Sequence, residues 1–134
     1  MNRILFVIIS VFITSFFIYP QAETEFFLEN SKVYDICPDG QYLWVATYGN
    51  GIFRYSYETD TWANYSSKTK SFDNDFFYCI AANEQYIWAG SSEGLFTYDR
   101  KKNTWSKKRF PQGGEWGHWI RSLCYDKVIH ALWI

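Results

Sequence analysis

The sequence has few cysteines, and their placement excludes two kinds of site. The three cysteines, Cys37, Cys79 and Cys124, form no Cys-x-x-Cys pair and have no histidine beside them, so a zinc ligand set is missing. Their odd number argues against a disulfide framework. We expect small buried apolar side chains, with a Cys37–Cys79 disulfide as the alternative in an exported protein.

Excess charge is also missing. Thirteen basic and fourteen acidic residues give a formal net charge of −1 at pH 7, which supplies no field that attracts nucleic acid or an anionic membrane surface. Lysines and arginines do gather between residues 100 and 109 around Trp105. A polyanion site is one interpretation, but we favour a solvated turn and an outermost edge strand, where lysines discourage edge-to-edge pairing. We therefore predict no nucleic-acid partner.

Helical periodicity is absent beyond the first 22 residues, and aromatic residues are abundant instead. The chain is 48% hydrophobic and 22% aromatic, with Trp 7, Tyr 11 and Phe 12. This composition excludes a disordered chain and suits one globular domain. Short apolar runs separated by turn residues indicate strands throughout.

The first 22 residues have the layout of a secretory signal peptide. Met1-Asn2-Arg3 supplies a positive start, Ile4–Tyr19 an apolar run and Ala22 a small residue at the cleavage point. As a helix, the apolar run would span roughly 24 Å at about 1.5 Å per residue, less than the roughly 30 Å of a hydrocarbon core. We predict export, with an uncleaved anchor as the alternative.

The remaining chain repeats itself with a period of about 43 residues. The spacing between matched residues shortens by one after the second strand, and a third copy begins near residue 120. The matched pairs are Ile36 and Ile80, Trp44 and Trp88, Gly51 and Gly94, Tyr55 and Tyr98, and Trp62 and Trp105.

Each repeat predicts four strands joined by tight turns. The predicted strands are Val33–Cys37, Tyr42–Thr47, Ile52–Tyr57 and Thr61–Tyr65 in the first unit, Phe77–Ala81, Tyr86–Ser91, Leu95–Asp99 and Thr104–Lys108 in the second, and Ile120–Leu123 and Leu132–Ile134 in the third. Gly51 and Gly94 suit a hairpin that needs positive φ.

This period belongs to propeller blades rather than to helical repeats. We predict an all-β fold of β-propeller blades, each a four-stranded antiparallel meander, in an incomplete propeller. The predicted divisions are a signal peptide at 1–22, a lead-in at 23–32, a first blade at 33–76, a second blade at 77–119 and the truncated start of a third blade at 120–134. Propellers need roughly four to eight blades, so we expect a fragment.

The second strand of each unit is apolar almost without interruption. "YLWVAT" and "YIWAGS" lack the alternation of a sheet with one wet face, so both faces are predicted to be buried between neighbouring blades. Ala46, Ala89 and Gly90 would let adjacent sheets approach. The repeated residues are predicted to be structural: Trp44, Gly51, Tyr55, Trp88, Gly94 and Tyr98.

The repeated phrases resemble two component regulator propeller repeats. The resemblance rests on LWVAT at 43–47 with GIFRY at 51–55, and on IWAGS at 87–91 with GLFTYD at 94–99. The family pattern is an apolar residue and Trp, a strand ending in small residues, then Gly, an apolar pair and an aromatic-Asp close. An Asp-x-x-Gly-like turn lies upstream.

The chain departs from this pattern at several places. Ala46 stands where Gly is usual, Ser56 stands where Asp is usual, and Asn83-Glu84 departs from the upstream turn. The resemblance implies an exported or periplasmic sensor region of a bacterial protein, ahead of a histidine kinase or another output domain. It implies no catalytic site, because the shared residues are structural.

The longer loops are the candidate binding site. In a meander, the hinges between second and third strands lie at the same end as the connections between blades, and function concentrates on loops held by a rigid scaffold. A ligand site there would use Tyr48 and Trp116 as stacking platforms. The predicted ligand-binding residues are Tyr48, Asn50, Asp73, Asp75, Glu93, Trp116 and His118; ordinary solvated loops are the alternative.

No catalytic residue, metal or cofactor is predicted. Asp73-x-Asp75 lacks the Gly and distal Glu of an EF-hand loop, and nothing fixes a carboxylate pair for glycoside hydrolysis. We predict a non-catalytic sensor segment that binds a small molecule, a glycan or a protein. The alternatives are a polysaccharide-binding or polysaccharide-degrading propeller, and an interaction scaffold, although the Gly-His and Trp-Asp signature of WD40 repeats is missing.

Overall fold

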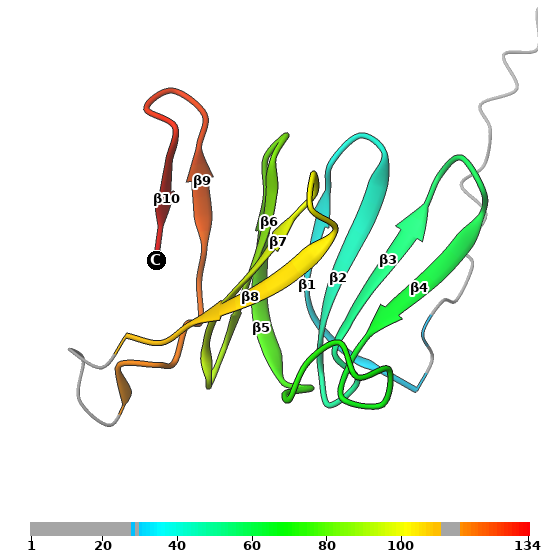
Figure 1. Ribbon diagram of the computed structural model, residues 1–134, viewed down its shortest axis with the longest axis horizontal. Helices are drawn as coiled ribbons and strands as arrows, with labels where there is room; N and C mark the ends of the chain where they lie inside the picture. Colours follow the sequence, from blue (N-terminus) through cyan, green and yellow to red (C-terminus); the bar gives the residue numbers. More distant parts are fainter. Residues whose placement is uncertain (1–27, 29, 111–115) are drawn as a thin grey trace, which may run out of the picture.

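The computed structural model describes residues 28, 30–110 and 116–134, which form three antiparallel sheets (Figure 1). The first sheet contains β1 (Lys32–Pro38), β2 (Tyr42–Tyr48), β3 (Ile52–Ser56) and β4 (Thr61–Tyr65), and the second contains β5 (Phe77–Ala82), β6 (Tyr86–Ser91), β7 (Gly94–Asp99) and β8 (Thr104–Lys108). A third sheet pairs β9 (Cys124–Asp126) with β10 (Ala131–Trp133).

The two four-stranded sheets are meanders in sequence order, and all eight strands predicted for them form. Gly51 (φ 76°) and Gly94 (φ 123°) take positive φ at the β2–β3 and β6–β7 hairpins, as predicted. Space is restricted there too. A Cβ on Gly51 would lie 2.1 Å from the Tyr65 carbonyl oxygen, and one on Gly94 would lie 2.3 Å from that of Lys108.

The third unit begins differently from the prediction. Residues 120–123 were expected to be its first strand, but that strand is β9, which starts later. The Ile120 N–H donates to the Ser91 carbonyl at 2.9 Å, and the Ile120 carbonyl accepts the Cys79 thiol at 3.6 Å. Residue 120 is therefore attached to the second sheet.

The core lies between the first two sheets. Trp44 on β2 has no exposed surface, and its ring lies 5.6 Å from that of Tyr98, 6.0 Å from Tyr65 and 6.3 Å from Trp105. Both sheets contribute residues to this core cluster. The uninterrupted apolar sequence of the second strand predicted such burial between neighbouring sheets. The buried members of the core cluster are Trp44, Ala46, Ile52, Phe77, Ile80, Ile87, Ala89, Phe96 and Tyr98.

Trp88, the counterpart of Trp44, is only half-buried. Its ring stacks on Tyr125 of β9 at 5.4 Å and lies 5.7 Å from Tyr86. Trp44 is covered by the outer strands of a neighbouring sheet, whereas Trp88 faces a sheet of two strands. The predicted burial of the second strand is therefore complete at Trp44, whereas Trp88 is buried only in part.

The cysteines are free, and their burial differs. Cys79 is buried, which raises its pKa to about 12. Cys37 is half-buried, and Cys124, on the two-stranded sheet, is exposed. The expected burial is therefore wrong for Cys124, and the alternative Cys37–Cys79 disulfide does not form.

The predicted signal peptide at 1–22 lies outside the described residues. Within residues 28, 30–110 and 116–134, no helix has the length and apolar character needed to cross a bilayer.

Trp44→Ala is expected to lower the free energy of unfolding by about 3 to 5 kcal/mol, because it leaves a large cavity between two sheets. Urea denaturation measures the change. Trp116→Ala is the matched control, because Trp116 is 63% exposed. Equal losses in the two variants would contradict the assignment of Trp44 to the shared core.

Gly51→Ala is expected to destabilise the protein more than Gly40→Ala. Both residues have positive φ, which costs a non-glycine residue about 1 to 2 kcal/mol. A Cβ at Gly40 meets nothing within 4 Å, whereas one at Gly51 collides with the Tyr65 carbonyl. Thermal denaturation of both variants measures the difference, and equal losses would show that the close approach at Gly51 has no cost.

Candidate functional site

The strands of the described chain run between two ends of the molecule (Figure 1). The hinges β2–β3 and β6–β7 and the connections between sheets lie at one end, called here the hinge end. The turns β1–β2 and β9–β10 lie at the other, called the turn end. The predicted ligand-binding residues belong to loops of the hinge end.

Aromatic rings form a continuous row at the hinge end. Tyr34 stacks on Tyr48 at 5.4 Å, and Tyr48 lies 6.0 Å from Tyr78. Tyr78 stacks on Trp119 at 6.3 Å, and Trp119 lies 4.9 Å from Trp116. Phe76 joins at 4.8 Å from Tyr48. We call these six residues the aromatic row: Tyr34, Tyr48, Phe76, Tyr78, Trp116 and Trp119.

The aromatic row is exposed to a degree that a structural core would not be. Tyr34 is 55% exposed and Trp116 is 63% exposed, and Tyr48, Phe76 and Trp119 are also exposed to solvent. Large contiguous apolar surface of this kind marks binding sites more often than ordinary surface. The row therefore leaves aromatic surface exposed to solvent.

A cation lies over the row. The guanidinium carbon of Arg121 is 5.0 Å from the ring centre of Trp119 and 5.9 Å from that of Tyr78. Arg121 is exposed and makes no ion pair with any residue that the structure describes. Its donors are available to a polar group of a ligand stacked on the rings.

The structure brings Tyr48 and Trp116 into this one row, but it separates the acidic residues predicted beside them. Asp73 pairs with Lys107 at 2.7 Å, and this hydrogen bond lowers the pKa of Asp73. Asp75 accepts the N–H of Ser67 at 2.7 Å and the Ser67 hydroxyl. Asp73 therefore ties the β4–β5 loop to β8, whereas Asp75 closes the same loop on itself.

The other predicted polar residues also hold loops. Glu93 pairs with Arg109, and Asn50 donates to the carbonyl of Asn30 at 3.3 Å. The Nδ1 atom of His118 accepts the Phe110 N–H at 3.2 Å. Among the residues with described placement, no three His, Cys, Asp or Glu side chains gather as metal ligands would.

The sequence analysis missed five residues of this site: Tyr34, Phe76, Tyr78, Trp119 and Arg121. Tyr34 and Tyr78 stand at the same position of successive repeats. The repeat thus carried a signal for two of them. Trp119 and Arg121 lie in the connection between β8 and β9, ahead of the first strand of the third unit.

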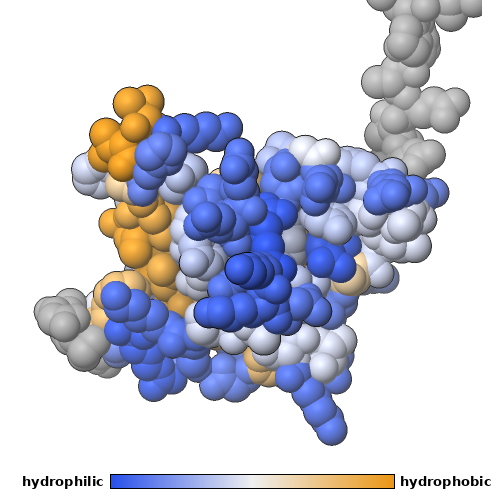
Figure 2. All heavy atoms as spheres, turned by 45° about the horizontal axis from the view of Figure 1, so that its top comes forward, coloured by the Kyte–Doolittle hydropathy of each residue, from blue (hydrophilic) through white to orange (hydrophobic). Residues whose placement is uncertain are grey.

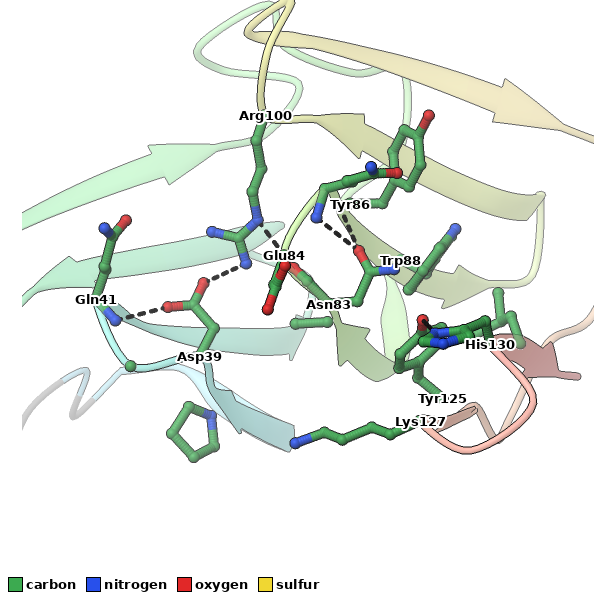
Figure 3. A pocket seen from close by; sticks show the side chains of 15 residues that line it. Asp39, Gln41, Asn83, Glu84, Tyr86, Trp88, Arg100, Tyr125, Lys127 and His130 are labelled. Atoms are coloured by element: carbon green, nitrogen blue, oxygen red, sulfur yellow. Dashed lines mark hydrogen bonds and ion pairs between the residues drawn. The ribbon is translucent and has the colours of Figure 1, made fainter.

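A cleft of about 1140 Å³ lies at the turn end, where no site was predicted. Figure 3 shows Asp39 and Gln41 of the β1–β2 turn on one side and Tyr125, Lys127 and His130 of the β9–β10 hairpin on the other. Trp88 lines the wall between them.

Asp39 joins the two large sheets beside this cleft. Its carboxylate accepts the Tyr42 N–H at 2.7 Å, the Trp44 indole N–H at 2.6 Å and Arg100 Nη2 at 2.7 Å. Burial acts to raise the pKa of Asp39, but the hydrogen bonds outweigh it and lower this pKa. Arg100 also donates from Nε to the Asn83 carbonyl at 3.1 Å.

The Asp39 turn recurs in all three units. Asn83 accepts the N–H groups of Gln85 and Tyr86 at 2.8 and 2.7 Å, and Asp126 accepts that of Val128 at 2.8 Å. An amide oxygen and a carboxylate oxygen are equally able to accept these bonds. Asn83 therefore forms the same turn, although Asn83-Glu84 departs from the sequence pattern of the family at this place.

This turn lies within the segment that identifies the repeat. Residues 28–49 match the family model of the two component regulator propeller. The match covers β1, β2 and the Asp39 turn, and it confirms the resemblance drawn from the sequence. Among curated proteins, no significant sequence match exists.

Solved structures share the fold over most of this chain. The extracellular domain of BT4673 from B. thetaiotaomicron, named in one structure as a one component system and in another as a hybrid two component system, matches with TM-scores of 0.66 and 0.65 at 21% identity. Each match covers 84% of this chain and 15% of the other.

The extracellular domain of BT3049 from the same organism, named as a hybrid two component system, matches with a TM-score of 0.58 at 20% identity over 72% of this chain and 13% of its own length. The predicted fold class, β-propeller blades, is therefore confirmed. This chain spans about 15% of the length of the first two domains.

Asp39→Asn is expected to destabilise the protein at neutral pH by about 1 to 3 kcal/mol, because it leaves the Arg100 guanidinium without its carboxylate. Since the folded state lowers the pKa of Asp39 below the ordinary 3.8, the ionised group stabilises the fold above that pH. This stabilisation is lost as the pH falls through the folded-state pKa. Denaturation midpoints measured between neutral pH and about pH 2 should therefore fall less steeply in the variant. Parallel profiles would contradict the role of Asp39.

Proposed function

We propose that the chain is a non-catalytic segment of an extracytoplasmic sensor propeller that binds its ligand on the aromatic row. The observation that carries this proposal is the row itself, in which each of six rings contacts at least one other and most are exposed. The rings come from both large sheets and from the connections that precede β5 and follow β8. Rings held by paired sheets lose little conformational freedom on binding.

The setting of a sensor is supported by the comparisons. The matched family is that of two component regulator propellers, and the similar solved structures are extracellular domains of proteins named as one component or hybrid two component systems. The predicted signal peptide agrees with the same location. We infer that an output domain receives the signal in the complete protein.

The engaged acidic residues favour binding over hydrolysis. A glycoside hydrolase needs two carboxyl groups facing one bond. At the hinge end Asp73 is paired with Lys107 and Glu93 with Arg109, while Asp75 is bonded to Ser67. These acids have structural partners, so a glycan on the row would be held rather than cleaved.

The decisive experiment is a binding screen of the complete chain against soluble polysaccharides, measured by retention and by released reducing sugar. We expect retention without release. Trp119→Ala and Trp116→Ala should each weaken retention about tenfold, because each removes a ring face that a ligand stacks on. Trp133→Ala is the matched control, since Trp133 is 59% exposed but lies on β10, outside the row.

Sugar release would contradict the non-catalytic assignment. Equal retention in all three variants would contradict the aromatic row as the site. If the unchanged protein retains no polysaccharide, the glycan ligand is excluded, and the small-molecule and protein ligands remain to be screened with the same variants.

A further inference from the structure

One position of the repeat lies at the aromatic row in all three units. In each unit the residue paired with the second-strand tryptophan sets the register, and these residues are Cys37, Ala81 and Cys124. Three residues before them stand Tyr34, Tyr78 and Arg121. The ring of Tyr34 lies 5.9 Å from that of Tyr78, and the guanidinium carbon of Arg121 also lies 5.9 Å from the Tyr78 ring. The packing of successive units therefore brings this position together.

Both tyrosines at this position stand at an irregularity of their strand. In β1 the pairing with β2 passes from Val33 directly to Asp35, which leaves Tyr34 out of the ladder. The pairing of β5 with β6 skips Tyr78 in the same way. Such β-bulges are frequent beside binding sites, because the extra residue re-aims a side chain. The same bulge in two units indicates that the repeat itself directs this position toward the aromatic row.

The third unit has a cation at this position instead of a ring. The Arg121 guanidinium contacts Trp119 as well as Tyr78, and the electron-rich faces of the two rings attract it and restrict its position. The side chain is nevertheless exposed to solvent. A guanidinium carries five N–H donors in a planar fork, which suits two parallel hydrogen bonds to a carboxylate or a similar oxyanion. Arg121 is therefore placed to bind an anionic group.

The described carboxylates of the hinge end do not neutralise this cation. Asp35, which follows Tyr34, accepts the Ile80 N–H at 2.8 Å, and Asp73 and Glu93 are paired with other cations. Because the formal net charge of the chain is −1, the protein as a whole does not attract anions. A preference for an anionic ligand would therefore come from this one position of the surface.

We propose that the ligand of the aromatic row is an acidic glycan, and that Arg121 binds its carboxylate or sulfate group. This inference rests on the proposed function, because it names the ligand class of the same site. The ring contacts run from Tyr34 on the first sheet to Trp116 after β8. Several linked sugar units can contact these rings at once, and an acidic unit among them supplies the oxyanion for Arg121.

The test measures the retention of the complete chain on three polymers. Polygalacturonate carries carboxylates, dextran sulfate carries sulfates, and dextran carries neither. Arg121→Gln removes the cation from an exposed position, and urea denaturation checks that this variant is folded. The matched control is Lys101→Gln, which removes one positive charge from the exposed β7–β8 turn. This turn belongs to the turn end, which comes forward in Figure 2 and has hydrophilic residues over its middle.

The unchanged protein should retain one of the two acidic polymers about tenfold more strongly than dextran, because a charge-assisted pair adds to the ring contacts. The preferred polymer identifies the anionic group. Arg121→Gln should remove this preference, and Arg121→Lys, which keeps the charge but not the planar fork, should restore part of it. Lys101→Gln should leave the preference unchanged. Trp119→Ala should weaken the retention of acidic and neutral polymers alike.

Equal retention on the acidic polymers and on dextran would overturn this inference, as would a preference that survives Arg121→Gln. Equal losses in Arg121→Gln and Lys101→Gln would also overturn it, because the overall charge would then govern retention. In each of these cases, weaker retention of Trp119→Ala would leave the proposed function standing. If no polymer retains the unchanged protein, a glycan is excluded, whereas a small-molecule or protein ligand of the row stays open to screening.

Discussion

The structure depends on one constraint, which is that the large apolar side chains of a sheet's middle strand must be covered by a neighbouring sheet. Trp44 meets this constraint fully, because its indole packs on rings from the neighbouring sheet and donates its N–H to Asp39. Asp39 is in turn held by Arg100 from that neighbour. Apolar packing and a charged hydrogen bond thus fix the same two sheets at the same place. The buried carboxylate is tolerated because every donor around it is aimed at its oxygens.

This packing separates two surfaces with different properties. At the hinge end, the loops are fastened by ion pairs such as Asp73 with Lys107, and the aromatic row lies exposed over them. At the turn end, the repeated Asp39-type turn organises backbone groups, and the cleft beside Trp88 is bordered by a hairpin of the third unit. Ligand recognition is proposed for the first surface. A single repeat supplies both because its turns and its hinges lie at opposite ends of every strand.

The sequence predicted the architecture well because the same features occur in each of the two repeats. A glycine at each β2–β3 type hinge and an apolar second strand between turns leave few other folds, and the eight strands of the two large sheets follow. The site was predicted only in part. Tyr48 and Trp116 were predicted because they lie in or beside the longer loops. The residues that they contact could not be predicted, because these contacts join different sheets and are not part of any single repeat. Trp88 is less buried than Trp44 because burial depends on what the neighbouring sheet contains. Asn83 departs from the family's sequence pattern but keeps the turn, because an amide oxygen can replace a carboxylate oxygen there.

The central claim is that the two large sheets form one cooperative unit through their shared core. Native-state hydrogen exchange measured amide by amide tests it most directly, with β2 and β6 as the reporters, since each is the central apolar strand of its sheet. The account predicts that the slowest amides of both strands exchange with the same opening free energy and respond equally to low concentrations of denaturant. If β2 opens well before β6, or β6 well before β2, the sheets are independent, and the shared core does not hold the fold together.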